Sequence, residues 1–160
     1  LMKEIIDDFC EEANSLFNLL ENSLNILEEN PSITKELEKF GQIIDRIMGA
    51  AKSIGAKEIA TFCELGKIIG YKSSQIKDIP LIEVVVAILF DSVDLLRKMT
   101  EALQAGSDIS MQKLNTKAFV TRLNWLSEKF KDIERSSCAI AGDKNGSQNS
   151  MEELMKSLGL

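Results

Sequence analysis

The chain has 160 residues, 44% of them apolar, and a formal net charge of −6. This length predicts one domain with a sizeable core, and the negative charge argues against nucleic acid and anionic membranes as partners. No apolar run reaches the roughly 18 residues that a membrane span needs, and the sequence shows no secretory signal. We therefore expect a cytoplasmic protein without membrane insertion.

The sequence lacks the residues on which many kinds of site depend. It holds three cysteines and no histidine. Cys10 and Cys63 fall on apolar helix faces, which predicts buried free thiols in a reducing compartment. Because no cluster of ligands, no nucleophilic triad and no glycine-rich phosphate loop is present, we expect no metal and no cofactor.

Apolar residues recur at three- and four-residue spacing along five long stretches, each of which predicts an amphipathic helix. Pro31 ends the first helix, and Ser32 is the predicted N-cap of the second, which Gly55 stops. A loop over 71–79 precedes the fourth helix, where Pro80 suits the first turn. The expected helices span 3–29, 32–54, 56–71, 80–105 and 110–134.

The character of the chain changes after residue 135. Residues 136–149 are small, polar and without periodicity, which predicts a flexible linker. Residues 150–160 predict a short amphipathic helix capped by Ser150. Such a short helix is not stable alone in water, so we expect it to fold against something, such as a partner. Its apolar residues, the tail stripe, are Met151, Leu154, Met155, Leu158 and Leu160.

The second expected helix has a polar face opposite its core face, and Gln42, Asp45 and Gly49 lie on it. A glycine in the middle of a helix costs roughly 1 kcal/mol relative to alanine. Because Gly49 is on the outward face, core packing does not explain it. We infer that something approaches the backbone closely there.

The stretch that starts at Asp45, DRIMGAAKSIG, resembles the phosphorylation helix of HPt domains, which include the first domain of CheA kinases. That helix has the form H-x-x-K-G-[SA]-[AS]-x-x-[LI]-G. Asp45 stands at the place of the phosphorylated histidine, and Met48 at that of the lysine. The resemblance implies an all-α fold: an HPt-like antiparallel four-helix bundle over 1–135, with a fifth helix and a tethered short C-terminal helix. It also implies a domain that cannot carry phosphohistidine. The matching residues are Gly49, Ala50, Ala51, Ile54 and Gly55.

The last 14 residues, SQNSMEELMKSLGL, are similar to the C-terminus of CheZ phosphatases, S-Q-x-x-V-D-D-L-L-x-S-L-G-F, which captures phosphorylated CheY. Lys156 departs from the pattern, since an acid is usual there. The segment also resembles the CheY-binding peptides of flagellar switch proteins. The resemblance implies a CheY-like receiver as partner, and it admits other chemotaxis or flagellar proteins. The identical residues are Ser147, Gln148, Leu154, Ser157, Leu158 and Gly159.

Three functions stay open at this point. The favoured one is a non-enzymatic module that docks a CheY-like receiver through the tail stripe, with Asp45 and Gly49 as a second contact. The alternative is a CheZ-like phosphatase, in which Gln42 and Asp45, or Asp108 and Gln112, would orient water. The CheZ spacing D-x-x-x-Q occurs only in the second pair, where Asp108 is better explained as a helix cap. In the third, Asp45 is an ordinary solvated acid on a structural domain of a larger assembly.

Overall fold

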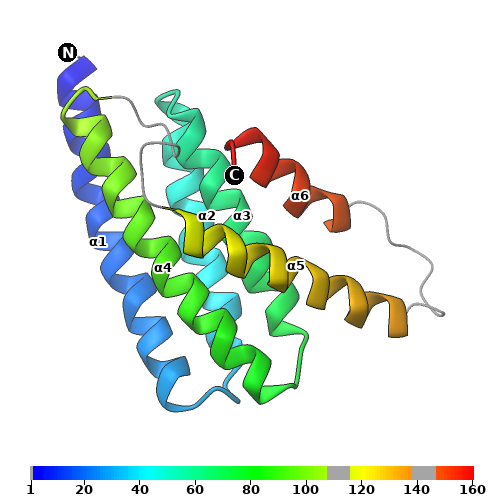
Figure 1. Ribbon diagram of the computed structural model, residues 1–160. Helices are drawn as coiled ribbons and strands as arrows, with labels where there is room; N and C mark the ends of the chain where they lie inside the picture. Colours follow the sequence, from blue (N-terminus) through cyan, green and yellow to red (C-terminus); the bar gives the residue numbers. More distant parts are fainter. Residues whose placement is uncertain (1, 108–115, 138–146) are drawn as a thin grey trace.

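The structure, a computed structural model, describes residues 2–107, 116–137 and 147–160. Within these ranges the chain forms six helices and no strand (Figure 1). The predicted all-α class is therefore confirmed for the described residues. The helices are α1 (Met2–Glu29), α2 (Lys35–Ser53), α3 (Lys57–Ser74), α4 (Ile79–Gln104), α5 (Lys117–Ser137) and α6 (Ser147–Ser157).

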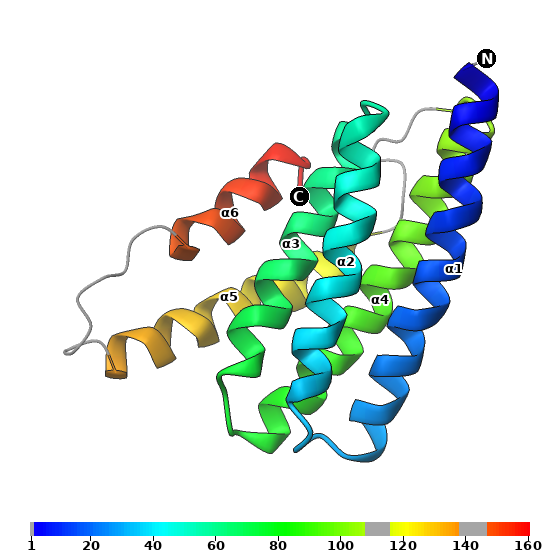
Figure 2. The ribbon, with the colours of Figure 1, turned by 180° about the vertical axis from the view of Figure 1, so that it is seen from behind.

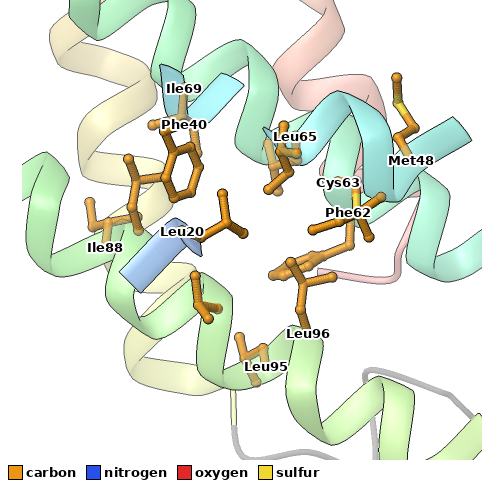
Figure 3. Packing of buried hydrophobic residues seen from close by; sticks show 14 of the residues in the cluster. Leu20, Phe40, Met48, Phe62, Cys63, Leu65, Ile69, Ile88, Leu95 and Leu96 are labelled. Carbon is orange, nitrogen blue, oxygen red and sulfur yellow. The ribbon is translucent and has the colours of Figure 1, made fainter. Parts of the chain in front are cut away.

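Helices α1 to α4 lie side by side, as both views of the ribbon show (Figures 1 and 2). Helix α1 packs against α2 and α4, and α3 packs against the same two helices, so the four close a ring around one core. Each contributes side chains to a single buried cluster, which Figure 3 shows from close by. Examples from α1 to α4 in turn are Leu20, Phe40, Phe62 and Ile88.

Helices α5 and α6 lie outside the ring. Helix α5 crosses it obliquely and contacts α4 (Figure 1). Phe119 of α5 packs against Phe62 of α3, with ring centroids 5.8 Å apart. Helix α6 packs mainly against α3 and also touches α5. None of the described helices is both long and apolar enough to cross a bilayer.

Local sequence signals place the start of α4 and the end of α2 correctly. Asp78 is the N-cap of α4, and its Oδ1 accepts a hydrogen bond from the backbone N–H of Leu81 at 3.1 Å. Pro80 lies in the first turn, as expected. Gly55 follows α2 with a φ of 76°, a left-handed conformation that glycine adopts without strain. The predicted C-terminal stop is therefore confirmed.

Several predicted boundaries are wrong. Helix α5 begins at Lys117 rather than at residue 110, and Ser150 lies inside α6 rather than at its N-cap. Ser32 does not cap α2; its hydroxyl donates to Asn30 Oδ1 at 2.6 Å, and the N-cap position is Thr34, without a side-chain bond. Helix α3 continues past Tyr71 to Ser74. The described residues of the predicted linker, 136–137 and 147–149, belong to α5 and α6, and the rest of that linker lies outside the described residues.

The two cysteines of the ring are buried free thiols, as predicted. Cys10 Sγ donates a hydrogen bond to the carbonyl oxygen of Thr100 at 3.7 Å, which links α1 to α4. Burial raises the pKa of the Cys63 thiol to about 12 and raises the pKa of Cys10 as well. Both thiols therefore stay protonated and unreactive at neutral pH. Cys138 lies outside the described residues.

Candidate functional site

The solvent-facing side of α2 carries the three residues that the sequence singled out. Gln42, Asp45 and Gly49 are all exposed, and together they are called the α2 face here. The helix is held in this orientation because its apolar residues recur every three or four positions and are buried in the ring. These buried residues are Leu37, Phe40, Ile43, Ile44, Ile47, Met48 and Ala51.

Gly49 leaves the backbone of α2 uncovered. A Cβ atom built on it would meet no heavy atom within 4 Å, apart from its own helix backbone. The glycine is therefore not required by packing inside the chain, as the sequence predicted. Since glycine destabilises a helix interior by about 1 kcal/mol relative to alanine, its presence at an open position favours a role in contact with another molecule.

Asp45 is paired rather than free. Its Oδ1 accepts a hydrogen bond from Lys67 Nζ of α3 at 2.7 Å, and the two side chains are 51% and 45% exposed, respectively. An ion pair this exposed contributes about 0–1 kcal/mol to stability, so a partner can separate it at little cost to the fold. The exposed carboxylate of Asp45 therefore has a lysine beside it that balances its charge.

Two grooves run along α2 and α3 on this side of the molecule. They have volumes of about 230 Å³ and about 400 Å³, and both are lined by Lys67 and Tyr71. Tyr71 is 66% exposed and presents an aromatic ring between them. Exposed aromatic rings are enriched where proteins bind one another. The first groove includes Gly41, Gln42 and Asp45, and the second includes Met48, Lys52 and Lys72.

The tail stripe is not free in this structure. Met151, Met155 and Leu158 are each at most 5% exposed, and Leu154 and Leu160 are half-buried. They are covered because α6 packs onto α3 and α5 (Figure 2). The expectation of a tail held ready for a partner is thus not what the structure shows. The physical reason is that an 11-residue helix cannot keep its apolar stripe in water.

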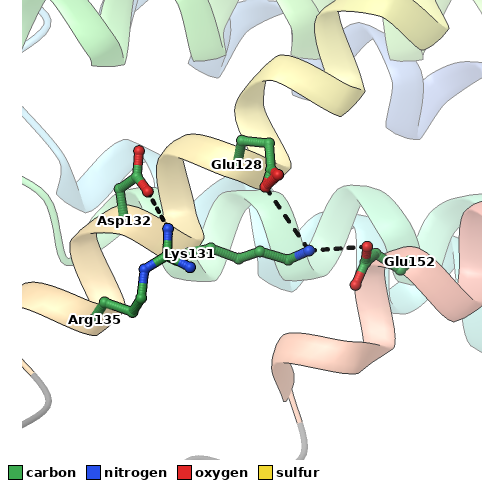
Figure 4. Close-up of polar contacts among 5 residues, drawn as sticks. All are labelled: Glu128, Lys131, Asp132, Arg135 and Glu152. Carbon is green, nitrogen blue, oxygen red and sulfur yellow. Dashed lines mark hydrogen bonds and ion pairs between the residues drawn. The ribbon is translucent and has the colours of Figure 1, made fainter.

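A charged contact fixes the polar side of α6 to α5 (Figure 4). Lys131 Nζ donates to Glu152 Oε2 at 2.9 Å and lies 3.9 Å from Glu128 Oε2. The hydrogen bond to Glu152, with the negative charge of both carboxylates, raises the pKa of Lys131 above its ordinary value. Lys131 is therefore charged throughout the physiological range.

The end of α6 is closed by a left-handed glycine. Gly159 has a φ of 79°, and the N–H of Leu160 donates to the carbonyl oxygen of Met155 at 2.9 Å. This reverse turn brings the side chain of Leu160 back against the buried cluster. Leu160 is thus part of the docked tail.

Comparison with known proteins places the chain in no family. The chain matches no known protein family, no curated protein and no solved structure. The likeness to HPt domains and to CheZ tails therefore depends on the quoted motifs. What the chain binds has to be inferred from the α2 face and the tail stripe.

Of the two residue pairs considered for phosphatase chemistry, the structure describes only Gln42 and Asp45. Gln42 and Asp45 lie one turn apart on α2, but Asp45 Oδ1 is engaged by Lys67. Asp108 and Gln112 lie outside the described residues. Nowhere in the described part of the chain do three or more potential metal ligands gather.

One feature of the α2 face was missed by sequence reasoning. Lys67 lies 22 residues after Asp45 and on a different helix, so helical periodicity within α2 could not reveal it. The only available signal was its place on the helix that follows α2, which must return antiparallel beside it. Lys67 therefore belongs to the candidate site together with Tyr71.

Proposed function

We propose that the chain is a non-phosphorylatable, HPt-like binding module of bacterial chemotaxis or two-component signalling that docks a CheY-like receiver in the cytoplasm. In this proposal, α1 to α4 serve as an antiparallel four-helix bundle, and α2 is the docking helix. The observation that carries it is the open backbone at Gly49, one turn from Asp45 on an exposed face. A receiver can approach such a surface closely.

Binding without phosphoryl transfer follows from the residue types. The chain has no histidine to accept a phosphoryl group. The carboxylate of Asp45 is paired with Lys67 at 2.7 Å, so the pair offers a partner one acceptor and one donor. Tyr71 adds an apolar surface beside them. The α2 face is therefore suited to recognition.

The tail stripe supplies a second contact for the same partner. Three apolar anchors on one side of a short helix fit the helix-in-groove mode of peptide recognition. Because the tail and the α2 face belong to one chain, binding of one raises the effective concentration of the other. Other chemotaxis or flagellar proteins with a similar groove are further candidate partners.

The test is to mix the purified chain with CheY-like receivers activated by acetyl phosphate. Both binding and loss of phosphate from the receiver are followed. We expect saturable binding to an activated receiver and no change in its rate of phosphate loss. The matched control is the same receiver with its phosphorylated aspartate replaced by alanine.

Two outcomes would contradict this proposal. The first is the absence of binding to every receiver tested. The second is phosphate loss at least tenfold faster with the chain than without it, abolished by Gln42→Ala or Gln112→Ala. That result would establish the CheZ-like phosphatase instead.

A further inference from the structure

The tail stripe, which the proposed function assigns to contact with a receiver, is already buried against other parts of the chain. Met151, Met155 and Leu158 are 2%, 5% and 5% exposed, respectively. Their cover comes from α3 and α5, the two helices that α6 contacts. This surface of α3 and α5 is called the cis site here.

The two helices of the cis site are joined by contacts that do not involve α6. Lys72 of α3 donates to Glu134 Oε2 of α5 at 2.7 Å, and its side chain is only 9% exposed. The ammonium group of Lys72 also lies 5.7 Å from the centre of the Phe130 ring. These contacts join α5 to α3, so the cis site is a defined surface for α6.

Among the described side chains of α6, apolar residues lie on one side of the helix. The described residues on its other side are polar or charged and exposed: Glu152, Glu153, Lys156 and Ser157. Of these, Glu152 already binds Lys131 of α5 (Figure 4). A receiver cannot reach the tail stripe while α6 is docked, and it gains no apolar contact from the exposed side.

We infer that α6 is an internal competitor of the receiver: the tail stripe binds either the cis site or the receiver, and never both at once. This inference rests on the proposed function. An 11-residue helix depends on its apolar contact to stay helical, so α6 exchanges one surface for the other. Only molecules in which α6 is undocked can bind the receiver through the tail stripe. The apparent Kd for this contact is therefore the intrinsic Kd divided by the undocked fraction.

The test locks α6 onto the cis site in the full chain. Lys131 and Glu152 are each replaced by cysteine in a Cys138→Ser background, where Cys10 and Cys63 remain buried. A cleavable thiol-reactive cross-linker, about as long as the two replaced side chains, then joins the new cysteines. The affinity for an acetyl-phosphate-activated CheY-like receiver is measured before cross-linking, after it, and after cleavage.

We expect the cross-link to form in high yield and to weaken receiver binding at least about tenfold, since the loss of buried apolar anchors costs an interface this much or more. Cleavage should restore the affinity. The matched controls are the two single-cysteine variants, Lys131→Cys and Glu152→Cys in the same background, which the reagent modifies without joining the helices.

The other outcomes overturn either the competition by α6 or the proposed function. Failure of the cross-link to form would show that α6 is not docked in solution, which overturns the competition. Locked and unlocked chains that bind the receiver equally would overturn the competition and leave the proposed function standing. An unlocked chain that binds no receiver would overturn the proposed function itself.

Discussion

Replacing Gly49 with glutamine should weaken receiver binding by a factor of about 30 or more, the factor that corresponds to about 2 kcal/mol at a central interface position. The new side chain would project from the middle of the α2 face and block close approach to its backbone. The fold should not suffer, because the space around Gly49 is open. The free energy of unfolding should rise by up to about 1 kcal/mol, since glutamine is the better helix former.

Calorimetric titration with the activated receiver measures the first effect, and urea unfolding measures the second. The matched control is Ala87→Gln, which adds the same side chain at an exposed position of α4. It should change neither receiver affinity nor stability appreciably. If the Gly49 variant binds as tightly as the Ala87 variant, the α2 face is not the docking surface.

Replacing Phe40 with alanine should destabilise the fold by about 3–5 kcal/mol, the usual cost of removing a buried phenylalanine side chain. Phe40 is fully buried in the cluster that α1 to α4 share (Figure 3). Small domains are stable by only about 5–15 kcal/mol, so this change should remove a large part of the free energy of unfolding. The measurement is the free energy of unfolding from urea titration followed by circular dichroism.

Tyr71→Ala is the matched control for this effect. It also removes an aromatic ring from a helix, but Tyr71 is 66% exposed and its loss leaves no cavity. We expect a change within about 1 kcal/mol for the control. A loss of less than 1 kcal/mol in the Phe40 variant would mean that Phe40 does not lie in a packed core.

The helices could be predicted from the sequence because their apolar residues recur every three or four positions. These are the residues that the structure buries in the core. Boundaries were harder where local and tertiary signals disagree. Residues 71–79 were expected to form a loop, partly because Ser73 is a common turn residue. In the structure Ser73 is fully buried and helical, and Ile76 is buried just beyond the end of α3. Packing against the ring thus overrides the local preference for a turn.

The α2 face was largely accessible to sequence reasoning, since one helix carries Gln42, Asp45 and Gly49. The ion pair between Asp45 and Lys67 could not be predicted in this way, because Lys67 comes from another helix. The tail is the opposite case. Its apolar stripe and its need for a partner surface were both visible, but no pattern within residues 150–160 could show that α3 and α5 provide that surface. Contacts between segments far apart in sequence require the fold.

A receiver that docks on the α2 face should shield the backbone amides of α2 from solvent. The measurement is amide hydrogen exchange of the full chain, alone and with an activated CheY-like receiver. We expect slower exchange in α2 around Gly49 when the receiver is present, and a change in residues 151–158 as α6 leaves the cis site. If exchange in α2 is the same with and without a saturating concentration of a receiver that binds, the α2 face is not where the receiver docks.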